Sequence, residues 1–281
     1  MCYSFESPKV FDKLLLDSDD PARNAIVISN PLGEDFSIMR TISLNGMLTS
    51  LSTNYNRRNT NVRLYEMGNI YIADRLPLES LPDERMQFTL GAYGDMDFFG
   101  MKGVVEEFFE AIGICGKIEY DPKAGKNFLH PGRQALISYN GSVLGYLGEV
   151  HPAVADNYEL GTKTYIAVID MPNVLPFASF DRKYVGLAKY PAVSRDISMV
   201  VPKEIMVGQI EAMITQRGGK ILESLSLFDI YEGSQIKDGY KSVAYNITFR
   251  AKDRTLNEDD INGAMKKILN GLESLGIELR A

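Results

Sequence analysis

The sequence predicts an α+β protein of two domains, and three observations support this fold class. Several segments alternate apolar and polar residues, which is typical of half-buried strands, and short turns join them as in antiparallel sheets. Other segments repeat apolar residues every three or four positions, as amphipathic helices do. The length of 281 residues favours two domains over one, at about 150 residues per domain.

The domain boundary is expected in a proline-containing stretch near residues 172–190. Residues 171–184 carry two prolines and show little periodicity, which is typical of a linker. Pro191 disfavours helix in the residue before it, so an extended segment is expected to open the second domain. The predicted domains are residues 1–180 and 190–281.

The first domain is predicted to mix strands and helices. Its strands are expected over residues 25–29, 62–72, 86–93, 135–139, 142–148 and 164–170. Asn140-Gly141 indicates a type I′ turn that joins two of these strands in a hairpin. Two helices are expected from apolar stripes, one over about 41–57 with Leu44, Met47, Leu48 and Leu51, and one after Gly100 with Met101, Val105, Phe108, Phe109 and Ile112. Antiparallel strands with helices on one side form an α+β domain.

The second domain has the most regular pattern. Its strands are expected over residues 196–201, 222–231, 240–250 and 277–280. The first helix has an apolar stripe that ends before Gly218-Gly219, namely Val207, Ile210, Met213 and Ile214. Thr255-Leu-Asn-Glu258 fits a capping box that opens a second helix. The stripe of that helix is Ile261, Met265, Ile268, Leu272 and Leu275.

This element order, β-α-β-β-α-β, is that of the ferredoxin-like fold. Both helices are expected to cover one face of the four-stranded sheet and to leave the other face open. The open face is expected to carry Asp196, Ser198, Asn246, Thr248 and Arg250. Around it lie six cationic residues, namely Lys241, Arg250, Lys252, Arg254, Lys266 and Lys267.

Two interpretations of this face remain open on the pattern alone. It could hold single-stranded RNA, with cations on phosphates and aromatic rings under bases. Tyr190, Phe228 and Tyr231 are the candidate rings, although strict alternation places Phe228 and Tyr231 on opposite faces. Alternatively, the charges form a solvated face and the rings belong to the core, which the pattern alone favours.

Composition excludes some classes of protein. The net charge of −7 argues against a protein that coats nucleic acid over its whole surface. All of this charge belongs to residues 1–185, because residues 186–281 hold 13 cationic and 13 anionic side chains. No apolar stretch approaches the roughly 18–20 residues that span a bilayer, and no basic leader opens the chain. The isolated cysteines Cys2 and Cys115 favour a reducing cytoplasm.

The sequence contains no Gly-x-Ser-x-Gly elbow, Walker loop or His-Glu-x-x-His motif. His130 and His151 are each followed by proline, so a turn-defining role is favoured over that of a base or ligand. Cys115 is expected to be buried packing rather than a nucleophile. We therefore predict no catalytic residue and no metal ligand, and the first domain is interpreted as a scaffold.

At the level of longer motifs, the chain resembles the β chains of bacterial phenylalanine–tRNA ligases. The matching motifs in the first domain are Asn30-Pro-Leu-Gly-Glu-Asp-Phe-Ser-Ile-Met-Arg-Thr41, Leu64-Tyr-Glu-Met-Gly68, Phe128-Leu-His-Pro-Gly-Arg133 and Gly145-Tyr-Leu-Gly-Glu-Val-His-Pro152. Those in the second are Lys189-Tyr-Pro-Ala-Val-Ser-Arg-Asp-Ile197, Leu227-Phe-Asp-Ile-Tyr231 and Phe249-Arg-Ala-Lys-Asp-Arg-Thr-Leu256. They occur in the family's order and resemble only its C-terminal third.

The resemblance implies a catalytic-like domain over residues 1–180, related to the class II synthetase core but without its chemistry. The late motif of that core needs an arginine and glycines, and the corresponding residues 164–171 contain neither. Arg63 and Glu66 are then remnants or interface contacts. The implied partners are a catalytic α subunit in an (αβ)₂ assembly and tRNA(Phe). The parent complex uses ATP and Mg²⁺, and no cofactor is expected in this segment.

The resemblance further implies that residues 190–281 bind the tRNA anticodon region, which moves the RNA interpretation ahead of the solvated face. The predicted contacts are Tyr190, Arg195, Asp196, Ser198, Asn246, Arg250 and Arg254. Cations would hold phosphates, and the shorter polar side chains would bind exposed base edges.

Two rival functions come from other classes. Small-molecule regulatory modules of the ACT type share the βαββαβ order, but their ligand usually sits at a glycine-containing loop after the first strand. Residues 201–206 contain no glycine, which counts against this alternative. An independent enzyme is disfavoured because no nucleophile–base pair is evident.

Overall fold

The computed structural model describes residues 3–114, 116–181, 183–184, 186–233 and 235–280. The chain divides into two compact units, unit 1 (Met1–Arg182) and unit 2 (Lys183–Ala281), and each is described by itself. The expected domain ranges 1–180 and 190–281 lie within these units.

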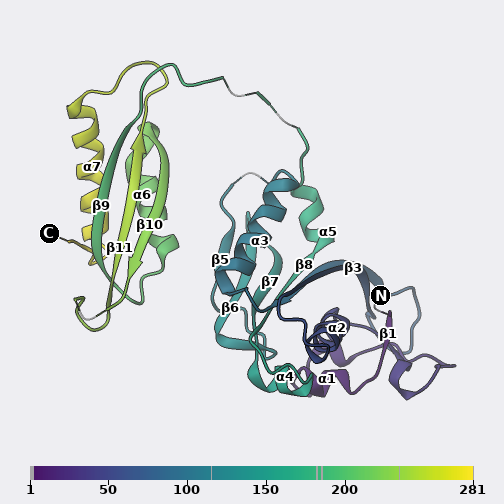
Figure 1. Cartoon of the computed structure of the whole chain (residues 1–281). Helices are drawn as coiled ribbons and strands as arrows, with labels where there is room; N and C mark the ends of the chain where they lie inside the picture. The colour runs from purple at the N-terminus through teal and green to yellow at the C-terminus, as the bar shows by residue number, and fades with distance from the viewer. Residues whose placement is uncertain (1–2, 115, 182, 185, 234, 281) are drawn as a thin grey trace. The chain divides into compact units, whose positions relative to one another are not determined.

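Unit 1 is built on a six-stranded antiparallel sheet (Figure 1). In spatial order its strands are β3 (Val62–Ile72), β4 (Asp83–Tyr93), β8 (Thr164–Asp170), β7 (Ser142–Val150), β6 (Leu129–Tyr139) and β5 (Glu119–Asp121). A second, two-stranded sheet pairs β1 (Phe5–Glu6) with β2 (Ile38–Met39). The helices are α1 (Val10–Lys13), α2 (Leu44–Asn56), α3 (Phe98–Ala111), α4 (Pro152–Asn157) and α5 (Met171–Val174).

The helices of unit 1 cover both faces of the large sheet rather than one side. Strand β8 shows this, because its alternate residues join two different apolar clusters. Ile166 and Val168 pack with α2 in one cluster, and Ala167 and Ile169 pack with α3 in the other. Since β8 is apolar at nearly every position, it has no polar face to expose. The expectation of helices on one side only was therefore wrong.

Most of the expected elements of unit 1 are present. The strands over 62–72 and 164–170 have the expected bounds, and the helix over 41–57 is α2. Asn140 and Gly141 have φ values of 49° and 79°, which confirms the type I′ turn, since both central residues of that turn need positive φ.

The strand expected over residues 25–29 was wrong. Val27 forms only an isolated bridge to Ile38, and its side chain is exposed. The Val27 side chain therefore does not pack against the core, and its pairing with Ile38 does not extend into a strand.

Unit 2 has the predicted βαββαβ order. Its elements are β9 (Val193–Pro202), α6 (Val207–Gly218), β10 (Leu222–Tyr231), β11 (Tyr240–Phe249), α7 (Glu258–Glu273) and β12 (Glu278–Leu279). The sheet is antiparallel in the order β10-β11-β9-β12. Helices α6 and α7 contact each other and share one core with the odd-numbered residues of β9 and β11 (Figure 1). The ferredoxin-like fold is therefore confirmed.

Two local details of unit 2 differ from expectation. The capping box of α7 lies two residues later than expected, because Asn257 rather than Thr255 is the N-cap. The Asn257 side chain accepts from the backbone N–H of Asp260 at 2.8 Å, and the Asp260 carboxylate accepts from the backbone N–H of Asn257 at 3.2 Å. Strand β10 also contains two bulges, one at Glu223 and one at Phe228, which strict alternation does not foresee.

Candidate nucleic-acid interface

The sheet of unit 2 presents one face that lies outside the apolar cluster shared with α6 and α7, and we call this the open face. Its position follows from the register, since Ile197, Met199 and Val201 of β9 point into the core and their neighbours point the other way. Its residues are mostly small or polar and comprise Ser194, Asp196, Ser198, Val200, Ser224, Ser226, Asp229, Tyr231, Ser242, Ala244, Asn246, Thr248 and Glu278.

A short ladder of hydrogen bonds crosses the open face from β9 to β11. The Asn246 amide donates to Asp196 Oδ1 at 2.6 Å, and the Thr248 hydroxyl donates to Asn246 Oδ1 at 3.3 Å. The hydroxyls of Ser194 and Thr248 lie 3.2 Å apart. These bonds fix the orientation of the Asn246 side-chain amide, whose nitrogen faces Asp196 and whose oxygen faces Thr248. An ionised carboxylate has about four acceptor positions, so Asp196 keeps the capacity to bind donors on an exposed base edge.

Two of the predicted arginines already have acidic partners. Arg250 Nε donates to Glu223 Oε2 at 2.9 Å, and its second nitrogen donates to the Tyr190 carbonyl at 2.8 Å. Arg250 therefore ties the extended entry segment of unit 2 to the end of the sheet. Arg254 bonds Asp260 at 3.0 Å at the start of α7. The backbone N–H of Asn257 and the Arg254 side chain together lower the pKa of Asp260.

The seven predicted contact residues do not form one cluster. Asp196, Ser198 and Asn246 lie together on the open face, and Arg250 and the Tyr190 carbonyl meet at the end of the sheet. Arg195 is different, because it pairs with Ile247, whose side chain is in the core, and so belongs to the helix-covered side of β9. Arg254 lies at the N-terminus of α7.

One residue on the open face, Arg280, escaped the sequence analysis, and a second, Tyr231, was a candidate ring whose face the pattern left open. Arg280, directly after β12, donates its backbone N–H to the Ser198 carbonyl at 2.8 Å, and its side chain donates to Ser242 Oγ at 3.4 Å. Tyr231 pairs with Ser242, because the bulge at Phe228 shifts the alternation by one residue. No local pattern marks such a bulge. The alternation of β12 could have indicated Arg280, but that strand has only two residues.

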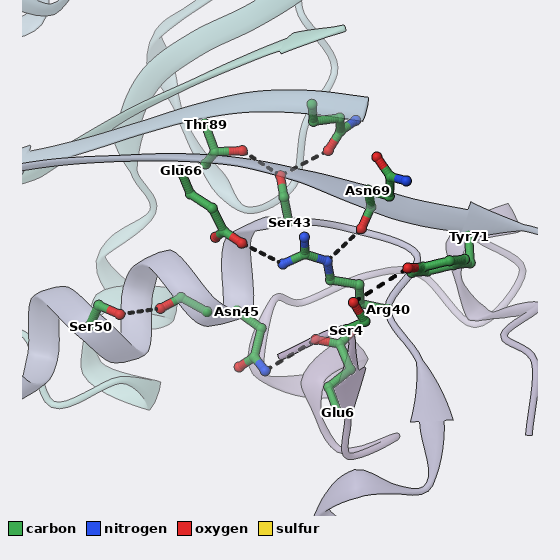
Figure 2. A network of polar contacts seen from close by, with 12 residues as sticks. Ser4, Glu6, Arg40, Ser43, Asn45, Ser50, Glu66, Asn69, Tyr71 and Thr89 are labelled. Atoms are coloured by element: carbon green, nitrogen blue, oxygen red, sulfur yellow. Dashed lines mark hydrogen bonds and ion pairs between the residues drawn. The ribbon is translucent and has the colours of Figure 1, made fainter. Parts of the chain in front are cut away.

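Unit 1 also contains a polar network, but it is buried. The Arg40 side chain, only 5% exposed, donates to Glu66 at 2.8 Å and to the Asn69 carbonyl at 2.6 Å (Figure 2). Gly68 makes room for it, because a Cβ there would collide with the guanidinium. Glu66 is thus an internal partner of Arg40.

Next to this pair, Asn45 links α2 to the N-terminal strand. Its amide donates to Glu6 Oε2 at 3.1 Å and accepts from the Tyr158 hydroxyl at 2.9 Å (Figure 2 shows the first contact). Burial raises the pKa of the Glu6 carboxyl to about 7, although Asn45 and the charge of Arg40 oppose this shift. These contacts join α2 to β1 and to the residue that follows α4.

The histidines take part in turns. The His151 side chain caps α4 by accepting from the backbone N–H of Ala153 at 3.2 Å, and His130 Nδ1 accepts from the backbone N–H of Gly132 at 3.1 Å. Cys2 and Cys115 lie outside the described residues, so the expectation for Cys115 stays a prediction. Within the described part of the chain, no group of three or more His, Cys, Asp or Glu side chains is placed to hold a metal ion.

A search of the described helices for one long and apolar enough to cross a membrane finds none.

Comparison with family models assigns both units. Residues 1–171 match the model of the phenylalanyl tRNA synthetase beta chain CLM domain, and residues 188–280 match that of the ferredoxin-fold anticodon binding domain. The second match disfavours the ACT-type alternative, because it covers nearly all of unit 2.

Curated relatives agree with these matches. The chain is 46% identical to the phenylalanine–tRNA ligase beta subunit of Clostridium acetobutylicum over 279 residues, which is 99% of this chain and 35% of the relative. It is 44% identical to that of Clostridium tetani over the same shares, and 36% identical to that of Moorella thermoacetica, over 99% of this chain and 36% of the relative. The chain therefore spans about a third of the length of these relatives.

Among solved structures, pyrrolysyl-tRNA synthetase from Desulfitobacterium hafniense superposes with a TM-score of 0.49 and 12% identity, over 62% of this chain and 61% of that one. This likeness is weak, and the assignment rests on the family models and the curated relatives. On those grounds, the chain belongs to the family of phenylalanine–tRNA ligase β subunits.

Proposed function

We propose that this chain acts as the non-catalytic, C-terminal part of a phenylalanine–tRNA ligase β subunit and binds the anticodon region of tRNA(Phe) through unit 2. The observation that carries the proposal is the open polar face, on a unit that matches a ferredoxin-fold anticodon binding domain. Single-stranded loops are the usual targets of sequence-specific RNA binding, and a sheet with exposed amide, carboxylate and hydroxyl groups suits their base edges.

The proposed contacts divide into two roles. Asp196, Ser198 and Asn246 bind base edges, because they lie together on the open face. Arg250 and Arg254 bind phosphates. Their charges are partly neutralised by Glu223 and Asp260, so each arginine contributes less to the affinity for RNA. Tyr190, at the end of the sheet, and Arg195, on the helix-covered side of β9, are the remaining proposed contacts.

For unit 1 we propose a scaffold role, as an inactive relative of the class II synthetase core. It would support assembly with the catalytic α subunit in an (αβ)₂ complex in the cytoplasm. The parent complex would use ATP and Mg²⁺ to attach phenylalanine to tRNA, and this segment would bind neither. The internal pairing of Glu66 with Arg40 supports this role, because it removes that carboxylate from any substrate.

The proposal is tested by co-expressing this chain with the α subunit and measuring co-purification and tRNA binding. We expect a stable complex that binds tRNA(Phe), whereas this chain alone should give no ATP–pyrophosphate exchange with phenylalanine. Failure to co-purify would contradict the assembly role. Absence of tRNA binding by the purified complex would contradict the anticodon role, and exchange by the chain alone would contradict the scaffold role.

A further inference from the structure

Strand β3 forms one edge of the large sheet of unit 1, and part of this edge is open. The backbone N–H of Tyr71 donates to the Arg40 carbonyl at 2.9 Å, and the Asn69 carbonyl accepts from the Arg40 side chain at 2.6 Å (Figure 2). The backbone groups of odd-numbered residues in β3 therefore point away from β4, since the direction repeats at every second residue. Among the described residues, the outward backbone groups of Tyr65 and Met67 have no partner.

The side chains of these two residues are apolar and exposed as well. Tyr65 is 74% exposed and Met67 is 54% exposed. The Tyr65 ring lies 6.0 Å from the ring of Phe88 on β4, and Phe88 lies 4.8 Å from the ring of Phe108 on α3. Val104, one helical turn before Phe108, is also exposed. An apolar surface therefore extends from the open edge of β3 to the flank of α3.

Such an edge is suited to bind another strand. Natural sheets usually cover or blunt an exposed edge, because its free N–H and C=O groups pair readily with a second chain. A strand added along β3 would pair the free backbone groups and would bury the Tyr65 and Met67 side chains at the same time. The two observations on β3 therefore indicate an interface formed by strand addition.

A second copy of β3 complements this edge when it runs antiparallel. With a two-fold axis at Tyr65, the Tyr65 residues of the two copies face each other, and Arg63 of each copy faces Met67 of the other. On the other face of the sheet, Leu64 faces Glu66, whose charge is paired inside its own unit. None of these pairs brings like charges together. About six backbone hydrogen bonds form, two for each hydrogen-bonded pair.

The neighbouring registers fit less well. An axis at Arg63 would place the two guanidinium groups opposite each other, and like charges in that position are destabilising. An axis at Met67 would pair Tyr65 with Asn69, whose carbonyl already accepts from the Arg40 side chain. Of these three registers, the one centred on Tyr65 alone uses the free backbone groups without opposing charges or displacing a bond.

From this geometry we propose that β3 is a contact between two copies of this chain, in which the two edges pair antiparallel across a two-fold axis at Tyr65. The pairing joins two six-stranded sheets into one continuous sheet. The inference goes beyond the proposed function, because it requires neither tRNA nor the α subunit. The paired surface is small, so the dimer forms reversibly and depends on protein concentration.

The test measures the mass of the full 281-residue chain by sedimentation equilibrium over a wide range of protein concentrations. The mass of the wild-type chain is expected to rise from that of a monomer to that of a dimer. Tyr65→Lys should raise the dissociation constant of the dimer at least about tenfold, because two ammonium groups then face each other. Tyr65→Glu should do the same. An equimolar mixture of these two variants should dimerise again, because opposite charges then meet at the axis.

Two further variants separate the edge from other effects. Phe99→Lys is the matched control, because Phe99 is 75% exposed and lies on the opposite side of α3 from Phe108. It should dimerise like the wild type. Met67→Pro removes a backbone N–H that points away from β4, so it should weaken the dimer and leave the pairing of β3 with β4 intact. Circular dichroism checks that each variant is folded.

Four results would overturn the inference. If the wild-type chain stays a monomer at every concentration, the edges do not pair. If Phe99→Lys weakens the dimer as much as Tyr65→Lys does, the added charge and not the edge is responsible. If the mixture of Tyr65→Lys and Tyr65→Glu remains monomeric, the two Tyr65 residues do not face each other. If Tyr65→Lys leaves the mass unchanged but prevents co-purification with the α subunit, the edge binds that subunit instead.

Discussion

The polar network around Arg40 in unit 1 lies mostly inside the fold, whereas the Asn246–Asp196 ladder of unit 2 lies on the surface of the sheet. The Arg40–Glu66 pair of unit 1 is nearly inaccessible to solvent, and the Asn246–Asp196 pair of unit 2 is exposed. Both pairs have similar donor–acceptor distances, 2.8 Å and 2.6 Å. The difference in burial therefore decides what each pair does.

A buried polar group has no water to replace a lost partner, so its bonds must be made inside the protein. The network of unit 1 accordingly joins β1, β2, α2 and β3 to one another. An exposed pair exchanges its bonds with water at little cost, and an incoming base can take the place of that water. The comparison thus supports the proposed division into a scaffold and a binding surface.

Breaking the buried pair should have the largest effect on stability. We expect Arg40→Met to lower the free energy of unfolding of unit 1 by about 3–5 kcal/mol, because it leaves the Glu66 carboxylate without a charged partner. Chemical denaturation followed by circular dichroism measures this. Arg195→Met, an exposed arginine, is the control and should change stability by less than about 0.5 kcal/mol. A loss below about 1 kcal/mol in Arg40→Met would show that the pair does not hold the unit together.

The next largest effect should depend on pH. The pKa of Glu6 is about 7 in the folded unit and about 4.3 in an unfolded chain, so between these values the folded form keeps a proton that the unfolded form loses. The free energy of unfolding should therefore fall as pH rises from about 4.5 to about 7, by about 3 kcal/mol in total.

Glu6→Gln should remove this part of the pH dependence and stabilise unit 1 at pH 8, as measured by denaturation at several pH values. Glu34→Gln is the matched control, because Glu34 is exposed and forms only a surface ion pair with Lys9. If Glu6→Gln and the wild type lose the same stability between pH 4.5 and pH 7, the Glu6 carboxyl is not buried as the structure has it.

The smallest effect on stability is expected on the open face. Asn246→Ala should change the free energy of unfolding of unit 2 by less than about 1 kcal/mol, because water replaces the exposed bonds. In the complete ligase it should weaken tRNA binding severalfold and leave ATP–pyrophosphate exchange unchanged. Nitrocellulose filter binding measures the first quantity. A variant that loses stability but binds tRNA normally would reverse the comparison between the two units.

Parts of both units were predictable from the sequence for a physical reason. Strand β8 is a continuous apolar run and β3 a long extended run, and both begin and end at the expected residues. Sequence patterns predict less well where a contact between side chains selects one of two possible structures. Thr255 and Asn257 are both good N-cap residues, and the carboxylate of Asp260 selects the second one.

The candidate site shows the same division. Alternation correctly placed Asp196, Ser198 and Asn246 on one face, because side chains along a strand point to alternate sides. It did not decide the face of Tyr231, because the bulge at Phe228 adds one residue to β10 opposite a single residue of β11. Composition marked Arg250 and Arg254 as available cations, but their partners Glu223 and Asp260 became evident only in the structure.

By itself, therefore, the sequence determined the two-domain α+β class, the βαββαβ order of unit 2, the family and the polar character of the open face. These follow from periodicity and motifs that are local in the chain. Only the tertiary structure decided that Arg40 pairs with Glu66 inside unit 1 and that Arg280 reaches Ser242 on the open face. Such contacts join residues far apart in the sequence, and their geometry depends on strand register, bulges and burial.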